Sequence, residues 1–380
     1  MRHRTLTAVA VMFWLSIYAY VPFVTPYAES MQADVRFIGL IAGTYGFVQM
    51  AIRFPLGLLS DKLQKRKIFI QAGLLFAAAS GVIVFLFPQP MTLFVSRSFA
   101  GVTAATWVAF TILAAAASDD AIKVIGRLNA AAGAAKVLAF VFGGAIAAWL
   151  GPRHAFLLGG AMGVLGLLLS FGIADKAPDA PAKQTPEFSV LLGTIRNPQL
   201  LCVALLAILS QYIQFSTTFG FSPMLAAHLG AEPYHLGLLG LVAAVATVVI
   251  SPAMGKLARG MGLSSTLAGA FALAAAGSVA MAASQALWQV FAAQFLIALG
   301  AAGLMALLMG LAIRDVPDET RATAMGFFQA VYGLGMFLGP SVMGWVSHSV
   351  TLAAAFVVTG AVAALGAVLS ALFVRKGFVR

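Results

Sequence analysis

Long apolar runs recur along the whole chain, and they constrain its fold more than any other feature. A helix needs about 20 apolar residues to cross the hydrocarbon core of a bilayer. Twelve runs of this kind occur, at 5–28, 37–60, 68–87, 91–117, 127–150, 154–174, 199–227, 235–257, 264–284, 287–313, 322–347 and 350–374. Backbone polar groups in lipid must be hydrogen-bonded within the chain, so such runs predict helices. The sequence therefore predicts an all-α integral membrane protein with twelve transmembrane helices.

Composition supports this prediction and excludes other classes of protein. The 380 residues are 61% hydrophobic and 9% charged, whereas a soluble domain carries about 25% charged residues. The net charge of +11 could indicate nucleic-acid binding, but the basic residues lie in short loops between apolar runs rather than on one polar face. We therefore expect the lipid bilayer, and no nucleic acid, as a partner. The single cysteine, Cys202, excludes an intrachain disulfide.

The distribution of lysine and arginine predicts the orientation in the membrane. If the N-terminus is cytoplasmic, 18 of the 23 basic residues fall in inner loops and tails, and only Arg36 and Arg153 fall in outer loops. An excess of basic residues is typical of cytoplasmic loops. We expect a multi-pass protein of the cell (plasma or inner) membrane with both termini in the cytoplasm.

The stretch 175–198 divides the twelve runs into six and six. It contains four prolines and mixed charges, which are typical of a linker. The predicted organisation is an N-terminal six-helix half at 1–174, a cytoplasmic linker at 175–198 and a C-terminal six-helix half at 199–380. Within the linker, apolar residues at helical spacing predict a short helix on the membrane surface: Phe188, Leu191, Leu192 and Ile195.

The loop between the second and third runs has a distinctive sequence, Gly57-Leu-Leu-Ser-Asp-Lys-Leu-Gln-Lys-Arg-Lys67. It resembles the signature loop between helices 2 and 3 of the major facilitator superfamily, roughly G-x-L-[AS]-D-[RK]-x-G-[RK]-[RK]. Gln64 stands where the family usually has glycine. A generic basic cytoplasmic loop is the alternative interpretation. The positions that fit the pattern are Gly57, Leu59, Ser60, Asp61, Lys62, Lys65 and Arg66.

The resemblance implies a secondary active transporter, not an enzyme, built from two six-helix pseudo-repeat halves that alternate access to a central site. The sequences of the two halves also align with each other, and Gly57 aligns with Gly255 and Gly101 with Gly300. In the family, the loop aspartate, here Asp61, favours a closed inner gate by meeting the N-terminus of span 11. The expected gating residues are Gly57, Asp61, Lys62 and Arg66, together with Arg53 near the inner surface.

Lys136 is the most informative charged residue in the sequence. It lies nine residues after Arg127, about 13 Å into the fifth span. All twelve acidic residues fall at or beyond the ends of spans. A midplane lysine without a carboxylate partner either loses its proton or pairs with an anion of a ligand. The alternative is an acidic partner on another helix.

Arg97 is a second cation within a span, about 9 Å from the outer edge of the fourth run. It begins Arg97-Ser-Phe-Ala-Gly101, which resembles an R-x-x-x-G motif of the family that is associated with coupling and substrate handling. Snorkelling to the outer headgroups is the alternative.

Polar residues at helical spacing form further stripes. Arg53 follows Tyr45 and Gln49 at i, i+4 and i+8 in the second span. Such residues often only join helices, at about 0.6 kcal/mol each, but the family resemblance places spans 1, 4, 7 and 10 around the cavity. The predicted substrate-binding residues are Tyr18, Gln49, Arg97, Lys136, Gln211, Gln214, Gln329 and Tyr332.

We therefore expect a proton-coupled transporter, acting as a monomer, that moves a small organic solute with an anionic group. A broad-specificity exporter of hydrophobic drugs is the alternative, because many Phe and Met residues would suit it. A membrane enzyme or receptor is disfavoured by the lack of a central acid, histidine or catalytic cysteine. We expect no cofactor and no metal site, because there is no phosphate-binding G-x-x-x-x-G-K-[ST] motif and every histidine lies at a span end or in a loop.

Overall fold

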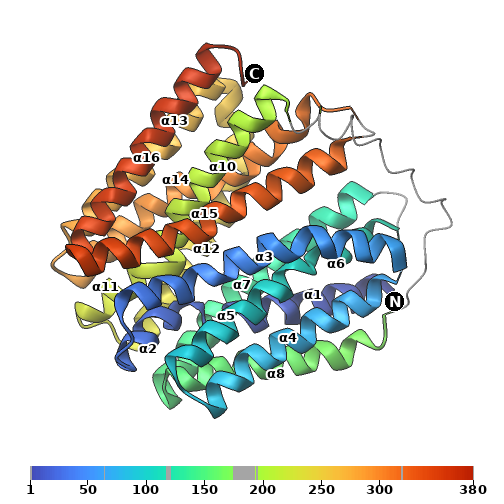
Figure 1. Cartoon of the computed structure of the whole chain (residues 1–380), viewed down its shortest axis with the longest axis vertical. Coiled ribbons are helices and arrows are strands. Elements are labelled where there is room, and N and C mark those ends of the chain that lie inside the picture. Colours follow the sequence, from blue (N-terminus) through green and yellow to red (C-terminus); the bar gives the residue numbers. More distant parts are fainter. Residues whose placement is uncertain are drawn as a thin grey trace. The chain divides into compact units, whose positions relative to one another are not determined.

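A computed structural model describes residues 2–63, 65–116, 121–173, 193, 196–317 and 320–379. All secondary structure in these residues is helical (Figure 1). The elements are α1 (Arg2–Tyr18), η1 (Val21–Phe23), α2 (Val24–Ser30), α3 (Val35–Leu63), α4 (Arg66–Leu86), α5 (Pro90–Ala105), α6 (Trp107–Ala116), α7 (Ala121–Leu150), α8 (Pro152–Ser170), α10 (Pro198–Ser216), η2 (Thr217–Phe221), α11 (Ser222–His228), α12 (Pro233–Met261), α13 (Leu263–Ala282), α14 (Leu287–Arg314), α15 (Arg321–Ser349) and α16 (Leu352–Arg375).

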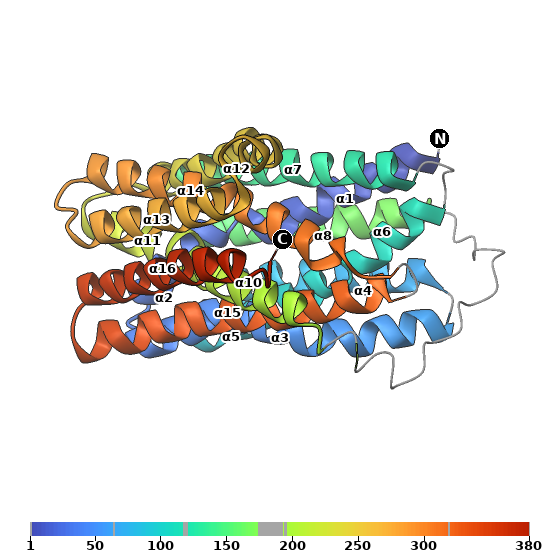
Figure 2. The same ribbon diagram turned by 90° about the horizontal axis from the view of Figure 1, so that it is seen from above.

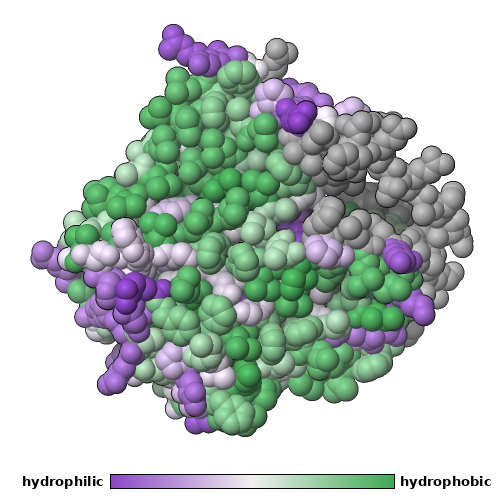
Figure 3. Space-filling model, in the orientation of Figure 1, coloured by the Kyte–Doolittle hydropathy of each residue, from purple (hydrophilic) through white to green (hydrophobic). Residues whose placement is uncertain are grey.

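The described residues contain twelve helical segments that are long and apolar enough to cross a membrane, which confirms the predicted number. Three of them are composite. The first comprises α1, η1 and α2, the fourth α5 and α6, and the seventh α10, η2 and α11. Figure 3 shows apolar side chains over most of the visible face, with hydrophilic ones gathered in patches toward its margins. An apolar exterior of this kind suits contact with lipid tails.

The two halves are structural repeats. α3 and α12 have the same length, and their first residues are separated by 198 positions (233 − 35). The same offset relates Gly57 to Gly255 (255 − 57). It also relates the residues that precede α2 and α11, Phe23 and Phe221, which share φ −98° and ψ −12°. The repeat read from the sequence is therefore present in the backbone.

The chain packs as two compact units. Unit 1 comprises Met1–Ala33, Phe47–Lys183 and Glu232–Leu241, and unit 2 comprises Asp34–Gly46, Gln184–Ala231 and Val242–Arg380. Within unit 1, α4 packs along α8, and α1 packs against α7 and α8. Within unit 2, α13 packs along α16 and α14, and α10 packs along α15 (Figure 2).

The first turns of α3 and α12 are equivalent in the repeat, and each packs through glycine. In unit 2, a Cβ added to Gly344 of α15 would lie 3.0 Å from the Cα of Gly39 in α3. In unit 1, a Cβ added to Gly144 of α7 would lie 3.2 Å from the Cα of Gly237 in α12. Small residues allow this backbone approach, on which helix association in membranes depends because burial of apolar surface gives no net gain there.

Most of the predicted linker, including the surface helix expected around Phe188–Ile195, lies outside the described residues. The boundaries 1–174, 175–198 and 199–380 stay a prediction.

Glycines of α15 show how closely helices pack in unit 2. A Cβ added to Gly335 would overlap the carbonyl oxygen of Ile208 in α10, and one added to Gly339 would meet the carbonyl oxygen of Tyr212. Gly335 and Gly339 belong to the G-x-x-x-G-P sequence that ends at Pro340. Close packing of α15 on α10 accounts for both glycines.

We predict that Gly335→Ala lowers the melting temperature of the purified protein by several degrees, because the added methyl group forces α10 and α15 apart. Overpacking of this kind costs about 1–3 kcal/mol. Gly326→Ala on the same helix is the matched control, since nothing lies within 4 Å of its added Cβ. Alanine forms helices better than glycine, so the control should melt at the same temperature or higher. Equal melting of the two variants would contradict the packing interpretation.

Candidate functional site

Lys136 lies on α7 with its ammonium group over two aromatic rings of α1. Its Nζ is 4.3 Å from the centroid of the Trp14 ring and 4.8 Å from that of the Tyr18 ring. Both distances are within the range of cation–π attraction. No carboxylate of the described residues lies within ion-pair distance of Lys136. The structure therefore pairs this lysine with aromatic faces rather than with an acid.

Further aromatic rings extend this site across three helices of unit 1. Trp107 of α6 contacts Trp14 edge to face at 5.0 Å, and Phe140 of α7 contacts Tyr18 at 5.8 Å. Phe13 and Phe110 are buried behind them. We define the aromatic–lysine cluster as Trp14, Tyr18, Trp107, Phe140 and Lys136.

The local sequence explains why the cluster forms. Trp14 and Tyr18 are spaced i, i+4 on α1, so both rings lie on one face of that helix. Lys136 and Phe140 have the same spacing on α7. A Cβ added to Gly143 of α7 would meet the backbone of Ala19, the residue directly after α1, so the two helices lie close together beside the cluster. Trp14, Tyr18, Trp107 and Lys136 are each only partly buried, whereas Phe140 is buried.

The aromatic rings offset only part of the cost of a cation within the membrane. Insertion scales place that cost at about 2.5–3.5 kcal/mol for a central lysine or arginine. A cation–π contact returns about 0.5–2 kcal/mol, depending on desolvation. The rings carry no net charge, so the site keeps a formal charge of +1 while Lys136 is protonated. The indole N–H of Trp14 is also buried, with no acceptor among the described residues. The cluster therefore offers positive charge and a hydrogen-bond donor.

Arg97 occupies a different part of unit 1. It is buried on α5 and lies beside the hydroxyl of Tyr20, just beyond the end of α1. The Tyr20 hydroxyl is 3.0 Å from the Ser80 hydroxyl of α4, and the Tyr20 ring stacks on Phe156 at 4.6 Å. No contact between Arg97 and Lys136 is recorded among the described residues. The structure therefore does not join the two cations in one contact.

In unit 2, a buried hydrogen bond lies at the break in the seventh span. Gln294 of α14, which is fully buried, donates through Nε2 to Oγ1 of Thr218 at 2.8 Å. Thr218 lies in η2, a single turn of π-helix; such turns are frequent at functional sites. Gln211, one of the predicted residues, is buried on α10 before this turn. Gln294 itself was missed, because a lone glutamine in an apolar run has no distinctive pattern.

The remaining predicted binding residues are spread over α3, α10 and α15. Gln49 is buried, and Gln214 and Gln329 are partly buried. Tyr332 is buried on α15 and contacts Phe328 edge to face at 5.6 Å. Tyr45 of the same stripe as Gln49 stacks on Phe215 at 5.8 Å. Of the predicted binding residues, the structure brings Tyr18 and Lys136 into contact.

Within the basic sequence motif, α3 ends at Leu63 and α4 begins at Arg66. Arg66 is buried and donates to the hydroxyl of Ser60, so it joins the two helices. Lys62 is exposed and Arg53 is partly buried. Gly57 and Asp61 lie in α3, but their surroundings are outside the described part of the chain, so their gating role stays a prediction.

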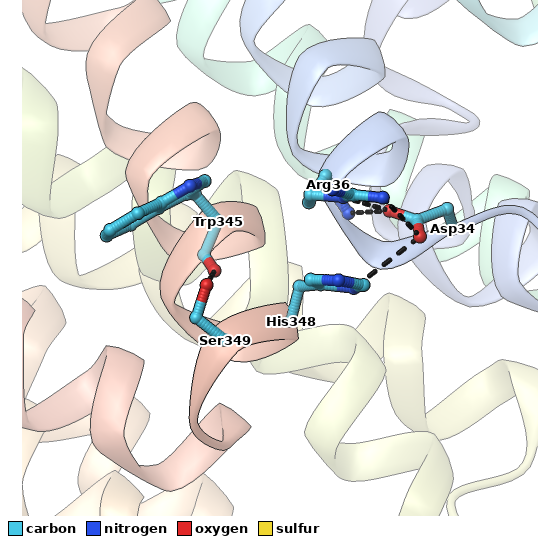
Figure 4. Close-up of polar contacts among 5 residues, drawn as sticks. All are labelled: Asp34, Arg36, Trp345, His348 and Ser349. Carbon is cyan, nitrogen blue, oxygen red and sulfur yellow. Dashed lines mark hydrogen bonds and ion pairs between the residues drawn. The ribbon is translucent and has the colours of Figure 1, made fainter.

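A charged group lies at the opposite end of α3 (Figure 4). The Asp34 carboxylate accepts from Nε of Arg36 at 3.0 Å and lies 3.5 Å from Nδ1 of His348 on α15. The hydrogen bonds from Arg36 hold the pKa of the Asp34 carboxyl below its usual range. Asp34 therefore stays ionised at neutral pH, and the stabilisation from this contact is lost only as pH falls through that lowered pKa.

The described residues contain no group of three His, Cys, Asp or Glu side chains that could hold a metal ion.

The profile of the Major Facilitator Superfamily matches residues 6–225 and 204–378. The inner membrane transport protein YajR of Escherichia coli is 25% identical over 342 residues, covering 88% of this chain and 74% of YajR. The multi-drug resistance efflux pump PmrA of Streptococcus pneumoniae is 26% identical over 339 residues, covering 86% of this chain and 84% of PmrA.

Among solved structures, a mutant of the nucleoside transporter NupG has the same fold, with a TM-score of 0.83, 11% identity and coverage of 100% of both chains. The described residues form twelve membrane-length helices in two repeats, with the fold of a solved transporter. Because the two profile matches together span nearly the whole chain, the chain belongs to the Major Facilitator Superfamily of transporters.

Proposed function

We propose that this transporter moves a small organic solute with an anionic group, and that Lys136 binds that group. The observation that carries the proposal is the position of the Lys136 ammonium over Trp14 and Tyr18 without a carboxylate partner in the described part of the chain. Opposite charges attract far more strongly in a low-dielectric site than in water. A carboxylate or phosphate of the solute would therefore offset the part of the cost of the Lys136 charge within the membrane that the aromatic rings do not offset.

The rest of the cluster supports an apolar part of the solute beside its anionic group. Trp14, Tyr18 and Trp107 are partly exposed rings around the ammonium. Aromatic faces bind planar and apolar groups, and ring pairs contribute about 0.5–1.5 kcal/mol beyond the area they bury. In this proposal, Tyr18 contacts the solute directly. Gln211 and Gln214 lie in unit 2, and their binding role stays a prediction for that unit alone.

We expect Lys136→Gln to weaken binding and flux of an anionic substrate at least tenfold while the melting temperature of the empty protein changes little. Each tenfold loss corresponds to about 1.4 kcal/mol, which a lost charge pair at a desolvated site readily exceeds. Candidate substrates are first identified by a thermal-shift screen of organic anions and cationic drugs. Binding and flux are then measured with purified protein and proteoliposomes.

Lys136→Arg is the matched control for this experiment. It keeps the charge but replaces a compact ammonium by a larger planar group, so it should bind better than Lys136→Gln and worse than the wild type. Substrate binding that survives in Lys136→Gln, together with a much lower melting temperature, would show that Lys136 only stabilises the fold.

Export of hydrophobic drugs is the second candidate function. The name of the relative PmrA, a multi-drug resistance efflux pump, favours it. Lys136→Gln should have opposite effects on transport in the two cases, because a cation in the cluster attracts an anionic solute but repels a cationic drug. Drug transport that is unchanged or faster in Lys136→Gln, with no response to any anion, would replace our proposal by this one.

We further propose that protons drive transport, that the protein acts as a monomer, and that it lies in the inner membrane with both termini in the cytoplasm.

Proton coupling is testable in proteoliposomes. We expect a protonophore to abolish concentrative substrate flux and a sodium gradient to leave it unchanged. Asp34 is a poor candidate for the proton-carrying group, because its lowered pKa keeps it ionised; Asp34→Asn should therefore retain coupled flux. Flux that follows sodium instead would overturn proton coupling.

A further inference from the structure

An open cavity of about 420 Å³ lies between the first three turns of α1 and the first two turns of α7 in unit 1. It is lined by Arg4, Thr7, Ala8, Val11 and Arg127. Arg4 lies ten residues along α1 from Trp14 and Arg127 lies nine residues along α7 from Lys136, which correspond to about 15 and 13 Å, whereas Val11 at the deep end lies three residues from Trp14. The charged end of the cavity is therefore separate from the aromatic–lysine cluster, and the function proposed above gives it no role.

The charge of the cavity is positive. Arg4 and Arg127 are both exposed, and no carboxylate is among the described residues that line it. Two guanidinium groups provide donors for phosphate oxygens, and arginine binds phosphate with two parallel hydrogen bonds.

The polar and apolar walls of the cavity are segregated along α1. Arg4 begins the first membrane span, and Val11 lies seven residues farther into it, about 10 Å along the helix. The charged residues thus lie at the membrane surface, and the apolar residues Ala8 and Val11 lie deeper. A phospholipid has this order of groups, with phosphate at the surface and acyl chain below. A small inorganic anion would need no apolar wall.

We propose that this cavity binds an anionic phospholipid, with its phosphate between Arg4 and Arg127 and the start of an acyl chain against Val11. The end of the bundle on which it lies carries most of the lysine and arginine residues and is the expected cytoplasmic side. Basic pockets between transmembrane helices on that side are suited to anionic headgroups. The bound lipid would join α1 to α7 at the end of these helices farthest from the Gly143 contact.

The test measures lipid binding to the purified full-length protein by native mass spectrometry, with phosphatidylglycerol, phosphatidylcholine and soluble glycerol 3-phosphate as probes. We expect the wild type to bind phosphatidylglycerol in preference to phosphatidylcholine. In Arg4→Gln/Arg127→Gln, we expect affinity for phosphatidylglycerol to fall roughly fivefold for each arginine removed, since a basic residue near an anionic surface contributes about 1 kcal/mol. Arg4→Lys/Arg127→Lys should recover part of the affinity.

Arg375→Gln/Lys376→Gln is the matched control, because it removes the same charge from exposed residues at the end of α16, outside the cavity. Its affinity for phosphatidylglycerol should equal that of the wild type. An equal loss in both double variants, or no loss in either, would overturn the site. Displacement of phosphatidylglycerol by glycerol 3-phosphate at similar concentration would show a site for soluble anions and would overturn the assignment to lipid.

Discussion

The site in unit 1 depends on one physical constraint, which is that a positive charge within a membrane helix needs a partner. The Nζ atom of Lys136 lies over two aromatic rings, 4.3 Å from the ring centroid of Trp14 and 4.8 Å from that of Tyr18. Aromatic faces attract an ammonium group and hold it in place, but they do not neutralise it. The site is therefore ordered and still positively charged, and these two properties together suit the binding of an anion.

The helices that carry this charge are positioned by small residues. Gly143 lets α7 approach α1, and Gly144 lets it approach the start of α12. In unit 2, Gly39 and Gly344 do the same for α3 and α15. The starts of α3 and α12 are equivalent in the internal repeat, so the same packing solution occurs in both units. Lipid does not drive helices together by apolar burial, so backbone contact of this kind sets the helix positions.

The sequence was sufficient to predict the helix count, the repeat and the family, because each depends on regular patterns. Membrane-length apolar runs and the Gly57–Lys67 motif are local signals that tertiary packing does not alter. It was also sufficient to single out Lys136, since a lysine far from every acidic residue stands out in an apolar chain. Trp14 and Tyr18 are also spaced i, i+4, and this spacing alone places them on one face of a helix.

The partners of these residues could not be predicted, because they come from contacts between helices far apart in the sequence. Trp107 joins Trp14 from α6, and Gln294 reaches Thr218 across 76 positions. The sequence grouped Arg97 with Lys136 because both are cations within spans, whereas in the fold Arg97 lies beside Tyr20 and Lys136 lies over the aromatic rings. Depth along a helix can be read from spacing, but the direction in which a side chain points across the bundle cannot.

The most direct test of this account is a structure of the protein with its transported solute bound. The account predicts an anionic group of the solute within about 4 Å of the Lys136 Nζ atom, the distance of an ion pair, and an apolar part of the solute against Trp14, Tyr18 or Trp107. A transported solute that is bound without an anionic group near Lys136, while the ammonium still lies over Trp14 and Tyr18, would contradict the account.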